Sequence, residues 1–428
     1  MHDSDFEISV ESLSKIEGHA DLVVTVKKDR VVDAKLKIFE SKRFFTQAMR
    51  GKPYATIPQM VSRICGTCSA AHLLCSTEAV EEAVGIQPSE QTMLLRKLAM
   101  YAAWIRDHAM HLYFFSLPDL LGKDSVLEFD GEEHGLLHEA LKVKGAGNRF
   151  GKMIGGRAIH PLYFQPGGVT SVPKKEDARA AIKELVEIRP LVLKLTGMFY
   201  NSPQEFHRTT HFASVINNDY SYCGEEIMVS DGTCIKEDDY FDHLRQVVLP
   251  YSTATGYDLG GYAFMVGALA RMNLNRESLH RETKKDAAEF LKAFPTQNMF
   301  RNNLAQAIEI LHAIDASKEI LEKTDFKPEP PAKPQRKAGR GIAAVEAPRG
   351  TLYHMVDVGE DGLVRDGSLV IPTQQNQINM EKDMRELVQA NIRKDREQIR
   401  RGLEALIRAY DPCMSCASHF LKIKWIRK

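Results

Sequence analysis

The sequence predicts a mainly α-helical protein of the α+β class, with a small β element at its N-terminal end. Four long stretches carry apolar residues at helical spacing, whereas one segment near the start alternates apolar and polar residues. The length of 428 residues allows one large unit or two domains. Apolar residues make up 43% of the chain, which is enough to bury a sizeable core.

The first half of the chain contains the β element and two of the helices. Residues 21–39 alternate on both sides of a Lys-Lys-Asp-Arg turn, as is typical of a β-hairpin, and we expect a β-rich part over residues 1–60. Residues 89–117 contain no proline and predict a long, largely buried helix. Residues 175–200 predict a second helix, with a kink or break at Pro190.

The second half contains two further helical stretches and a connector. Residues 282–323 predict a helix that is interrupted near Pro295. Residues 379–410 predict the last helix, which should stop just before Pro412. Between these two stretches, residues 326–344 are rich in Pro, Gly, Lys and Arg and predict an exposed connector.

Charge and cysteine content narrow the class of protein. The 57 basic and 57 acidic residues balance, so no overall field favours nucleic acid or an anionic membrane. No apolar run approaches the 18 or so residues of a membrane span, and the acidic start lacks a secretory pattern. An odd number of cysteines in a long chain favours a reducing compartment, so we expect a cytoplasmic protein. The seven are Cys65, Cys68, Cys75, Cys223, Cys234, Cys413 and Cys416.

Two Cys-x-x-Cys pairs stand near opposite ends of the chain. The first lies in RICGTCS at residues 63–69 and is followed by His72; the second lies in DPCMSC at residues 411–416 and is followed by His419. A spacing of two residues lets both thiolates of a pair bind one metal ion. Four thiolates form a soft site that suits zinc, iron–sulfur clusters or nickel.

Spacing alone leaves the kind of metal site open. A structural zinc site is the commonest meaning of paired Cys-x-x-Cys, but zinc ribbons place their pairs roughly 15–20 residues apart. Here nearly the whole chain lies between the pairs. A thioredoxin-like redox pair would explain the first pair and not the second.

The residues of both motifs resemble the first and last signatures of nickel–iron hydrogenase large subunits. The short form of the last motif resembles the soluble, multimeric group of that family. This resemblance implies the family's fold, a core of long helices within a single domain spanning residues 1–428. Further segments resemble the family in chain order. They are Ile16–His19, Arg106–His108, His111–Tyr113, Gly156–His160, Phe264–Gly267, Asn302–Gln306, Glu346–Gly350 and Pro372–Thr373.

The resemblance implies a nickel–iron centre that catalyses heterolytic cleavage of dihydrogen into a hydride and a proton. In the family the iron also carries cyanide and carbon monoxide. Pro372, Thr373 and His72 are implied to lie against this cofactor. The implied nickel ligands are Cys65, Cys68, Cys413 and Cys416, of which Cys68 and Cys416 also bind iron.

A base must stand within hydrogen-bond reach of the departing proton. The resemblance implies two candidates, a terminal thiolate (Cys413 or Cys65) and Arg349, which is a weak base in isolation because it stays protonated. Asp107 and Asp411 are expected to hold the guanidinium by charge-assisted hydrogen bonds. Glu17 stands at the family's proton gate, although without the resemblance it would be interpreted as a surface carboxylate at a strand end.

The sequence departs from the family pattern at one position and raises a question at its end. In the family a Glu and the final His, here His419, help to bind magnesium, but Thr46 stands at the Glu position. A neutral hydroxyl is a weaker ligand for a hard cation, so we expect magnesium binding to be lost or taken over by other ligands. The family precursor is usually cut after the final His, which implies that residues 420–428 are a maturation tail.

The sequence outside the two cysteine pairs carries no pattern for an iron–sulfur cluster or a dinucleotide, which implies partner subunits. Cys75, Cys223 and Cys234 are scattered and not spaced for a cluster, so a separate iron–sulfur small subunit is implied. No Gly-x-Gly-x-x-Gly fingerprint occurs, so a flavin, NAD(P) or ferredoxin-linked site belongs to a further subunit. Two alternatives are a non-catalytic relative like the quinone-module subunit of respiratory complex I, which lacks the four cysteines, and a four-cysteine zinc scaffold.

Overall fold

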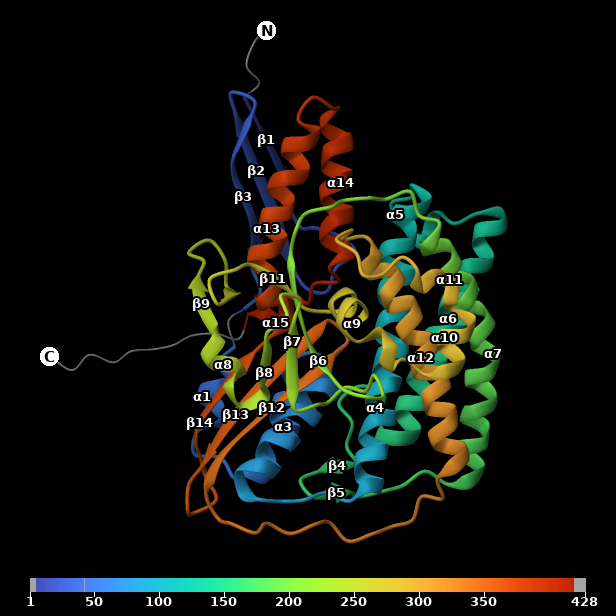
Figure 1. Ribbon diagram of the computed structural model, residues 1–428, viewed down its shortest axis with the longest axis vertical. Coiled ribbons are helices and arrows are strands. Elements are labelled where there is room, and N and C mark those ends of the chain that lie inside the picture. Colours follow the sequence, from blue (N-terminus) through green and yellow to red (C-terminus); the bar gives the residue numbers. More distant parts are fainter. Residues whose placement is uncertain (1–4, 42, 419–428) are drawn as a thin grey trace, which may run out of the picture.

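An antiparallel sheet and two helices form one end of the molecule (Figure 1). The computed structural model describes residues 5–41 and 43–418. Buried side chains alternate along β2 and β3, which confirms the predicted hairpin, and β1 adds a third strand within the part that was expected to be β-rich. The elements are β1 (Phe6–Val10), β2 (Ala20–Lys27), β3 (Arg30–Ile38), α13 (Pro372–Asn391) and α14 (Arg396–Ala409).

The last predicted helix is in fact two helices. α13 begins earlier than expected, at Pro372, and ends at Asn391. The side chain of Asp395 accepts hydrogen bonds from the backbone N–H groups of Glu397 and Gln398, so α14 starts anew there. The predicted stop before Pro412 is confirmed, because α14 ends at Ala409.

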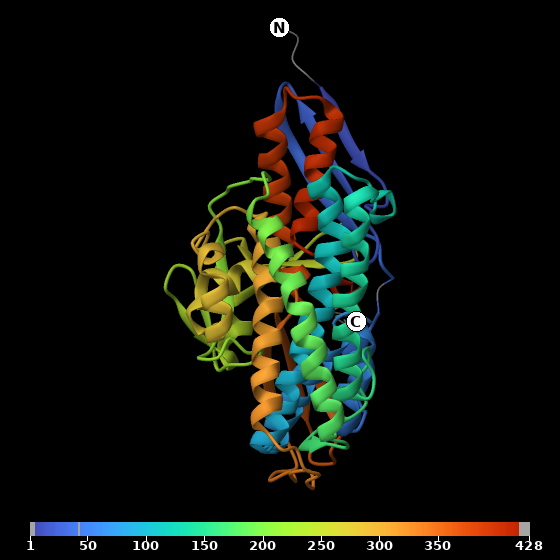
Figure 2. The same cartoon turned by 90° about the vertical axis from the view of Figure 1, so that its right-hand side faces the viewer.

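Four long helices pack together along the other side of the molecule, as Figures 1 and 2 both show. α4 confirms the predicted buried helix and continues into a π-helical turn over residues 110–116. A kink or a break was predicted at Pro190; because Pro190 lies inside α7 without ending it, the break is wrong. Packing against α6 and α12 offsets the roughly 3 kcal/mol that proline costs. The four are α4 (Glu90–Ala109), α6 (His134–Gly155), α7 (Lys175–Tyr200) and α12 (Arg301–Lys323).

The third part of the fold is a central helix packed on a three-stranded sheet. α3 packs on the antiparallel sheet β12–β13–β14. The predicted connector is wrong in its last part, because strand β12 begins at Gly339 and is largely buried. Gly341 lies so close to α3 that a Cβ would stand 1.9 Å from the carbonyl oxygen of Ala79. The elements are α3 (Ser69–Val84), β12 (Gly339–Ala347), β13 (Gly350–Val358) and β14 (Val364–Val370).

The sequence did not predict the remaining strands, which are short and irregular. β11 pairs parallel to β6, and β7 and β8 continue this sheet antiparallel; β9 pairs with β10, and β4 with β5. They are β4 (Phe164–Gln165), β5 (Gly168–Val169), β6 (His211–Ile216), β7 (Glu226–Val229), β8 (Cys234–Lys236), β9 (Leu244–Val248), β10 (Thr255–Leu259) and β11 (Phe264–Met265).

Short helices complete the chain. The interruption predicted near Pro295 is confirmed, because α10 and α11 precede α12 across a non-helical stretch. No helix among the described residues is long and apolar enough to cross a membrane. The short helices are α1 (Phe45–Met49), α2 (Ile57–Val61), α5 (Leu117–Leu121), α8 (Tyr240–His243), α9 (Ala268–Asn275), α10 (Arg281–Asp286), α11 (Ala288–Leu291) and α15 (Met414–Ala417).

Candidate metal centre

The two cysteine pairs meet in the interior and form one four-cysteine cluster. The Sγ atoms of Cys65 and Cys413 are 3.5 Å apart, and those of Cys68 and Cys416 are 2.8 Å apart. All four sulfur atoms lie within 4.8 Å of one another, and all four residues are buried. The fold therefore brings together the four ligands that the sequence predicted.

Two segments, one near each end of the described chain, pair with each other at this cluster. Cys68 precedes the first turn of α3, and Cys413 precedes the first turn of α15. Glu17 forms a parallel β-bridge with Cys413, and its carbonyl accepts a hydrogen bond from the N–H of Met414 at 2.9 Å. Gly18 has φ +84°, and a Cβ there would stand 2.8 Å from the Cβ of Met414, so only glycine allows this approach.

The Glu17 carboxylate faces the sulfur atoms. Its Oε2 lies 3.1 Å from the Sγ of Cys413 and accepts from the N–H of Ser415 at 3.1 Å, and its Oε1 lies 3.9 Å from the Sγ of Cys65. Burial raises the pKa of Glu17, and the negative charge of Cys65 adds to the rise. A buried carboxyl with a raised pKa beside thiols can both accept and give up a proton.

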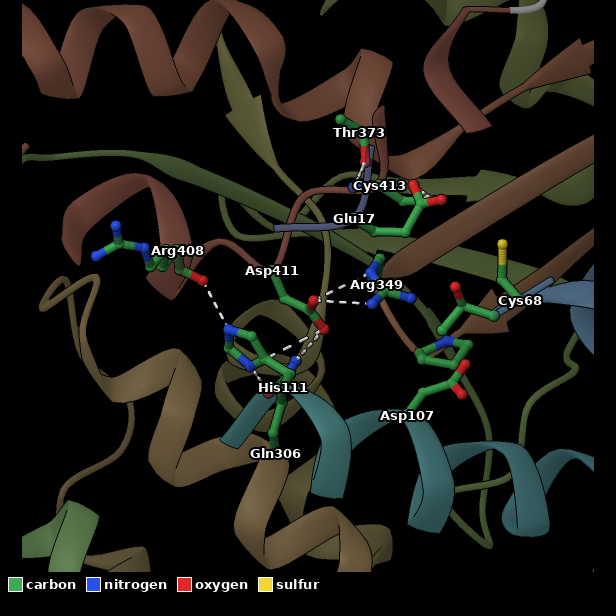
Figure 3. A network of polar contacts seen from close by, with 12 residues as sticks. Glu17, Cys68, Asp107, His111, Gln306, Arg349, Thr373, Arg408, Asp411 and Cys413 are labelled. Carbon is green, nitrogen blue, oxygen red and sulfur yellow. Dashed lines mark hydrogen bonds and ion pairs between the residues drawn. The ribbon is translucent and has the colours of Figure 1, made fainter. Parts of the chain in front are cut away.

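Arg349 enters the site from the turn between β12 and β13 (Figure 3). Its Nε donates to Oδ1 of Asp411 at 3.1 Å, and its Nη2 forms an ion pair with the same oxygen atom at 2.9 Å. Burial alone would lower the pKa of Arg349, but Asp411 and Cys413 outweigh it and raise the pKa. Its Nη1 is buried and has no hydrogen-bond partner among the described residues. Asp411 thus holds the Nε and Nη2 side of the guanidinium, and Nη1 is available to bind a further group.

Asp107 does not hold Arg349 as expected. Its Oδ1 accepts from Nε of the neighbouring Arg106 at 2.7 Å, and its Oδ2 is buried with no hydrogen-bond partner among the described residues. The Arg106 side chain turns instead toward backbone carbonyl oxygens, to which both of its terminal nitrogens donate. Burial raises the pKa of Asp107, while Arg106 and Arg349 act to lower it.

Sequence reasoning missed the residues that lie behind Asp411. Its Oδ2 accepts from the amide nitrogen of Gln306 at 3.0 Å, and Oε1 of Gln306 lies 2.5 Å from Nδ1 of His111. The other ring nitrogen of His111 lies 2.7 Å from the carbonyl oxygen of Arg408 (Figure 3). Both His111 and Gln306 lie in segments that resemble the family, but only the fold places them against Asp411.

Comparison with known proteins decides the family. A family model described as nickel-dependent hydrogenase matches residues 43–139 and 253–419. The chain is 32% identical over 424 residues to sulfhydrogenase 1 subunit alpha of Pyrococcus furiosus, covering 97% of this chain and 98% of that relative. The chain belongs to the nickel-dependent hydrogenase family. The resemblance described from the sequence is therefore confirmed, and the chain is a hydrogenase.

Other relatives and solved structures agree with this assignment. The NAD-reducing hydrogenase HoxS subunit beta of Cupriavidus necator is 30% identical over 475 residues, with 97% of this chain and 95% of that one covered. A crystal structure of an NAD⁺-reducing [NiFe]-hydrogenase in the H2-reduced state matches with a TM-score of 0.87 at 24% identity, over 98% of this chain and all of that one. The predicted large-subunit fold is thereby confirmed.

The cluster of this hydrogenase fits nickel and iron. Four sulfur ligands form a soft site, which suits these metals. Burial raises the pKa of Cys413 and of Cys416 well above the ordinary value, so all four sulfurs can lose their protons together only beside a compensating positive charge. Two of the buried polar atoms that have no hydrogen-bond partner among the described residues, on Arg349 and Asp107, belong to residues that face this region.

The other predicted site residues also lie at the cluster. Nε2 of His72 is 3.7 Å from the Sγ of Cys416, its Nδ1 is 3.1 Å from Nε2 of His354, and burial lowers its pKa to about 4. Oγ1 of Thr373 accepts from the N–H of Cys413 at 2.9 Å.

For Pro372 the structure shows only its burial and its position in a helix. Pro372 is buried and opens α13, next to Thr373. Two predictions at the end of the chain stay untested. His419, expected as a magnesium ligand, and the expected maturation tail 420–428 lie outside the described residues, so both stay predictions.

Proposed function

We propose that this hydrogenase catalyses the reversible heterolytic cleavage of dihydrogen at a nickel–iron centre held by its four-cysteine cluster. The observation that carries the proposal is the gathering of four buried sulfurs within 4.8 Å, with the Glu17 carboxyl 3.1 Å from one of them and the Arg349 guanidinium beside them. A zinc scaffold needs only the sulfurs. The acid–base groups around them favour catalysis.

The cysteines divide into two kinds of ligand in this proposal. By the family resemblance, Cys68 and Cys416, whose Sγ atoms are 2.8 Å apart, would be the ligands of both nickel and iron. Cys65 and Cys413, which lie on the side of Glu17, would bind nickel. When bound, the metals supply Lewis acidity that polarises the H–H bond, and the family resemblance adds cyanide and carbon monoxide on iron.

Protons leave through side chains of this chain. The proton from dihydrogen passes to the Sγ of Cys413 and from there to Oε2 of Glu17, 3.1 Å away, which starts the route toward solvent. Arg349, fixed by Asp411, presents its free Nη1 to the reacting hydrogen and stabilises the charge that develops there. Asp107 balances the charge of the guanidinium without a direct hydrogen bond.

Electrons pass to partner subunits. We infer an iron–sulfur small subunit, because the three cysteines outside the cluster are scattered in the sequence. The names of relatives as alpha, beta and A subunits, among them an NAD-reducing enzyme, support an assembly that reaches NAD(P) or ferredoxin through further subunits. A cytoplasmic location stays a prediction.

Metal analysis combined with an activity assay tests the proposal. We expect nickel and iron at about one each per chain in the purified complex, and hydrogen-dependent reduction of an artificial acceptor. Zinc alone, with no hydrogen-dependent reduction, would support the scaffold instead. Absence of all three metals would support a non-catalytic subunit like that of complex I.

A further inference from the structure

Arg271, on α9, is a second buried arginine near the centre, and neither its role nor its contacts follow from the sequence motifs. Its side chain is 2% exposed. It lies over the ring of Trp104 on α4, with the guanidinium carbon 5.1 Å from the ring centroid. It does not contact the cysteines through any hydrogen bond among the described residues.

Every N–H group of the Arg271 guanidinium has an acceptor. Nε and Nη2 donate to the two carboxylate oxygens of Glu309 at 2.6 and 2.7 Å, and Nη1 donates to Oε2 of Glu346 at 2.7 Å. The remaining two N–H groups donate to the carbonyl oxygens of Ala347 and Pro348, both at 3.0 Å. An arginine has five donors, and all five are used here.

Two of those acceptors belong to the backbone just before Arg349. The carbonyl groups of Ala347 and Pro348 fix the turn from which the Arg349 side chain projects. The turn is also tight from the other side: Gly350 has φ +129°, and a Cβ there would stand 2.8 Å from the backbone nitrogen of Gly267. Arg271 thus holds two carbonyl groups of a turn that close packing at Gly350 already restricts.

The Arg271 guanidinium is also linked to helix α4, through Glu309. Oε2 of Glu309 lies 2.9 Å from Nε2 of His108, the residue that follows Asp107 on α4. Burial would raise the pKa of Glu309, but Arg271 outweighs it and lowers the pKa to about 2. Because an ionised carboxylate only accepts, Nε2 of His108 is the donor in this contact, and burial lowers the pKa of His108. The helix of Asp107 and the turn of Arg349 are therefore tied to one cation.

We propose that Arg271 is a positioning residue for hydrogen cleavage, which holds the backbone of Arg349 and thereby places its guanidinium over the four-cysteine cluster. This inference rests on the proposed function, because it needs Arg349 to take part in the reaction. A lysine at position 271 keeps the charge, but its three donors cannot serve two carboxylates and two carbonyl groups from one point. A displacement of about 1 Å of a catalytic group can slow a reaction roughly a hundredfold.

A double-mutant cycle in the purified complex tests the proposal. Arg271→Lys, Arg349→Lys and the double variant are compared with wild type for nickel content and for D2/H⁺ exchange, with kcat and KM for hydrogen measured separately. We expect Arg271→Lys to keep its nickel and KM and to lose roughly ten- to a hundredfold in kcat. Because Arg271 acts through Arg349, the double variant should be no slower than Arg349→Lys, within about twofold.

The outcomes separate the two proposals. If the losses of the single variants multiply in the double variant, Arg271 acts independently and its positioning role is rejected. If Arg349→Lys keeps wild-type kcat, the role given to Arg349 under the proposed function is rejected first. Arg189→Lys is the matched control, because Arg189 also binds a carboxylate of α12 through two nitrogens, at 2.7 and 2.9 Å from Asp315, away from the turn. It should leave kcat unchanged.

A second variant covers the case in which Arg271→Lys does not retain nickel. Oε1 of Glu346 accepts from the N–H of Val215 at 2.9 Å and the hydroxyl of Thr351 at 2.7 Å, and Oε2 accepts from Arg271. Because these neighbours donate, Glu346→Gln must turn its NH2 toward a donor and loosen the same turn. It should lower kcat, and the loss should disappear in the Arg349→Lys background; a wild-type kcat for Glu346→Gln would overturn the proposal.

Discussion

The four-cysteine cluster and the polar wall beside it, formed by Arg271, Glu309, Glu346, Arg349 and Asp411, are built in different ways. The cluster takes its ligands from two short motifs, and their sulfurs meet directly. The wall takes its side chains from α9, α12, the end of β12, the β12–β13 turn and the segment after α14. Arg271 donates to both Glu309 and Glu346, and Arg349 donates to Asp411. The geometry within each cysteine pair thus depends on local spacing, although the fold must bring the two pairs together, whereas every acid–base group is placed by distant packing.

The largest effect should come from breaking the cluster itself. Cys416→Ser replaces a soft thiolate by a hydroxyl at the closest sulfur pair, so we expect loss of nickel and of hydrogen oxidation together. Metal analysis and a hydrogen-dependent dye assay check this. Cys223→Ser, outside the cluster, should behave like wild type; an active Cys416→Ser enzyme would remove the basis for the site.

A smaller effect is expected where the cluster meets its proton acceptor. Glu17→Gln keeps the hydrogen bond from Ser415 but cannot take a proton from Cys413, so kcat should fall roughly a hundredfold or more while nickel stays bound. Exchange of D2 with solvent protons measures this step. The exposed Glu7→Gln serves as control, and equal exchange rates in both variants would exclude Glu17 from proton transfer.

A substitution in the polar wall should lower kcat without loss of metal. Asp411→Asn removes the charge that fixes Arg349, and we expect kcat to drop roughly ten- to a hundredfold with nickel retained. Steady-state kinetics with metal analysis on the same sample check both parts. Asp286→Asn, which removes a partly exposed partner of Arg189, should change neither. Loss of nickel in Asp411→Asn would show that the wall and cluster are not separable.

The smallest effect should appear at a contact that supports the cluster without touching a reacting atom. Thr373→Val removes the acceptor of the Cys413 N–H and leaves that buried group unsatisfied, at a cost of roughly 1–3 kcal/mol. We expect faster release of nickel to a chelator and nearly unchanged kcat. Thr170→Val, at an exposed hydrogen bond, is the control. Equal release rates for the two variants would contradict the prediction.

Sequence signals predicted the elements whose cues are local. The alternation in residues 21–39 predicted the hairpin, and the spacing in residues 89–117 predicted α4. The break inside the last helix also had a local signal in Asp395, whose capping role was overlooked. Pro190 misled the prediction because packing on both sides supports α7 across the missing hydrogen bond. The short strands β6 to β11 had no clear period.

The sequence by itself determined that each cysteine pair can bind one metal ion, because two thiols two residues apart can converge on one ion. It also supplied the candidates Glu17, Arg349 and Asp411. Only the tertiary structure decided that Asp411, and not Asp107, holds Arg349, and that Arg271 fixes the turn behind it. Hydrogen bonds between residues far apart in the chain depend on packing geometry, and residue spacing does not encode that geometry.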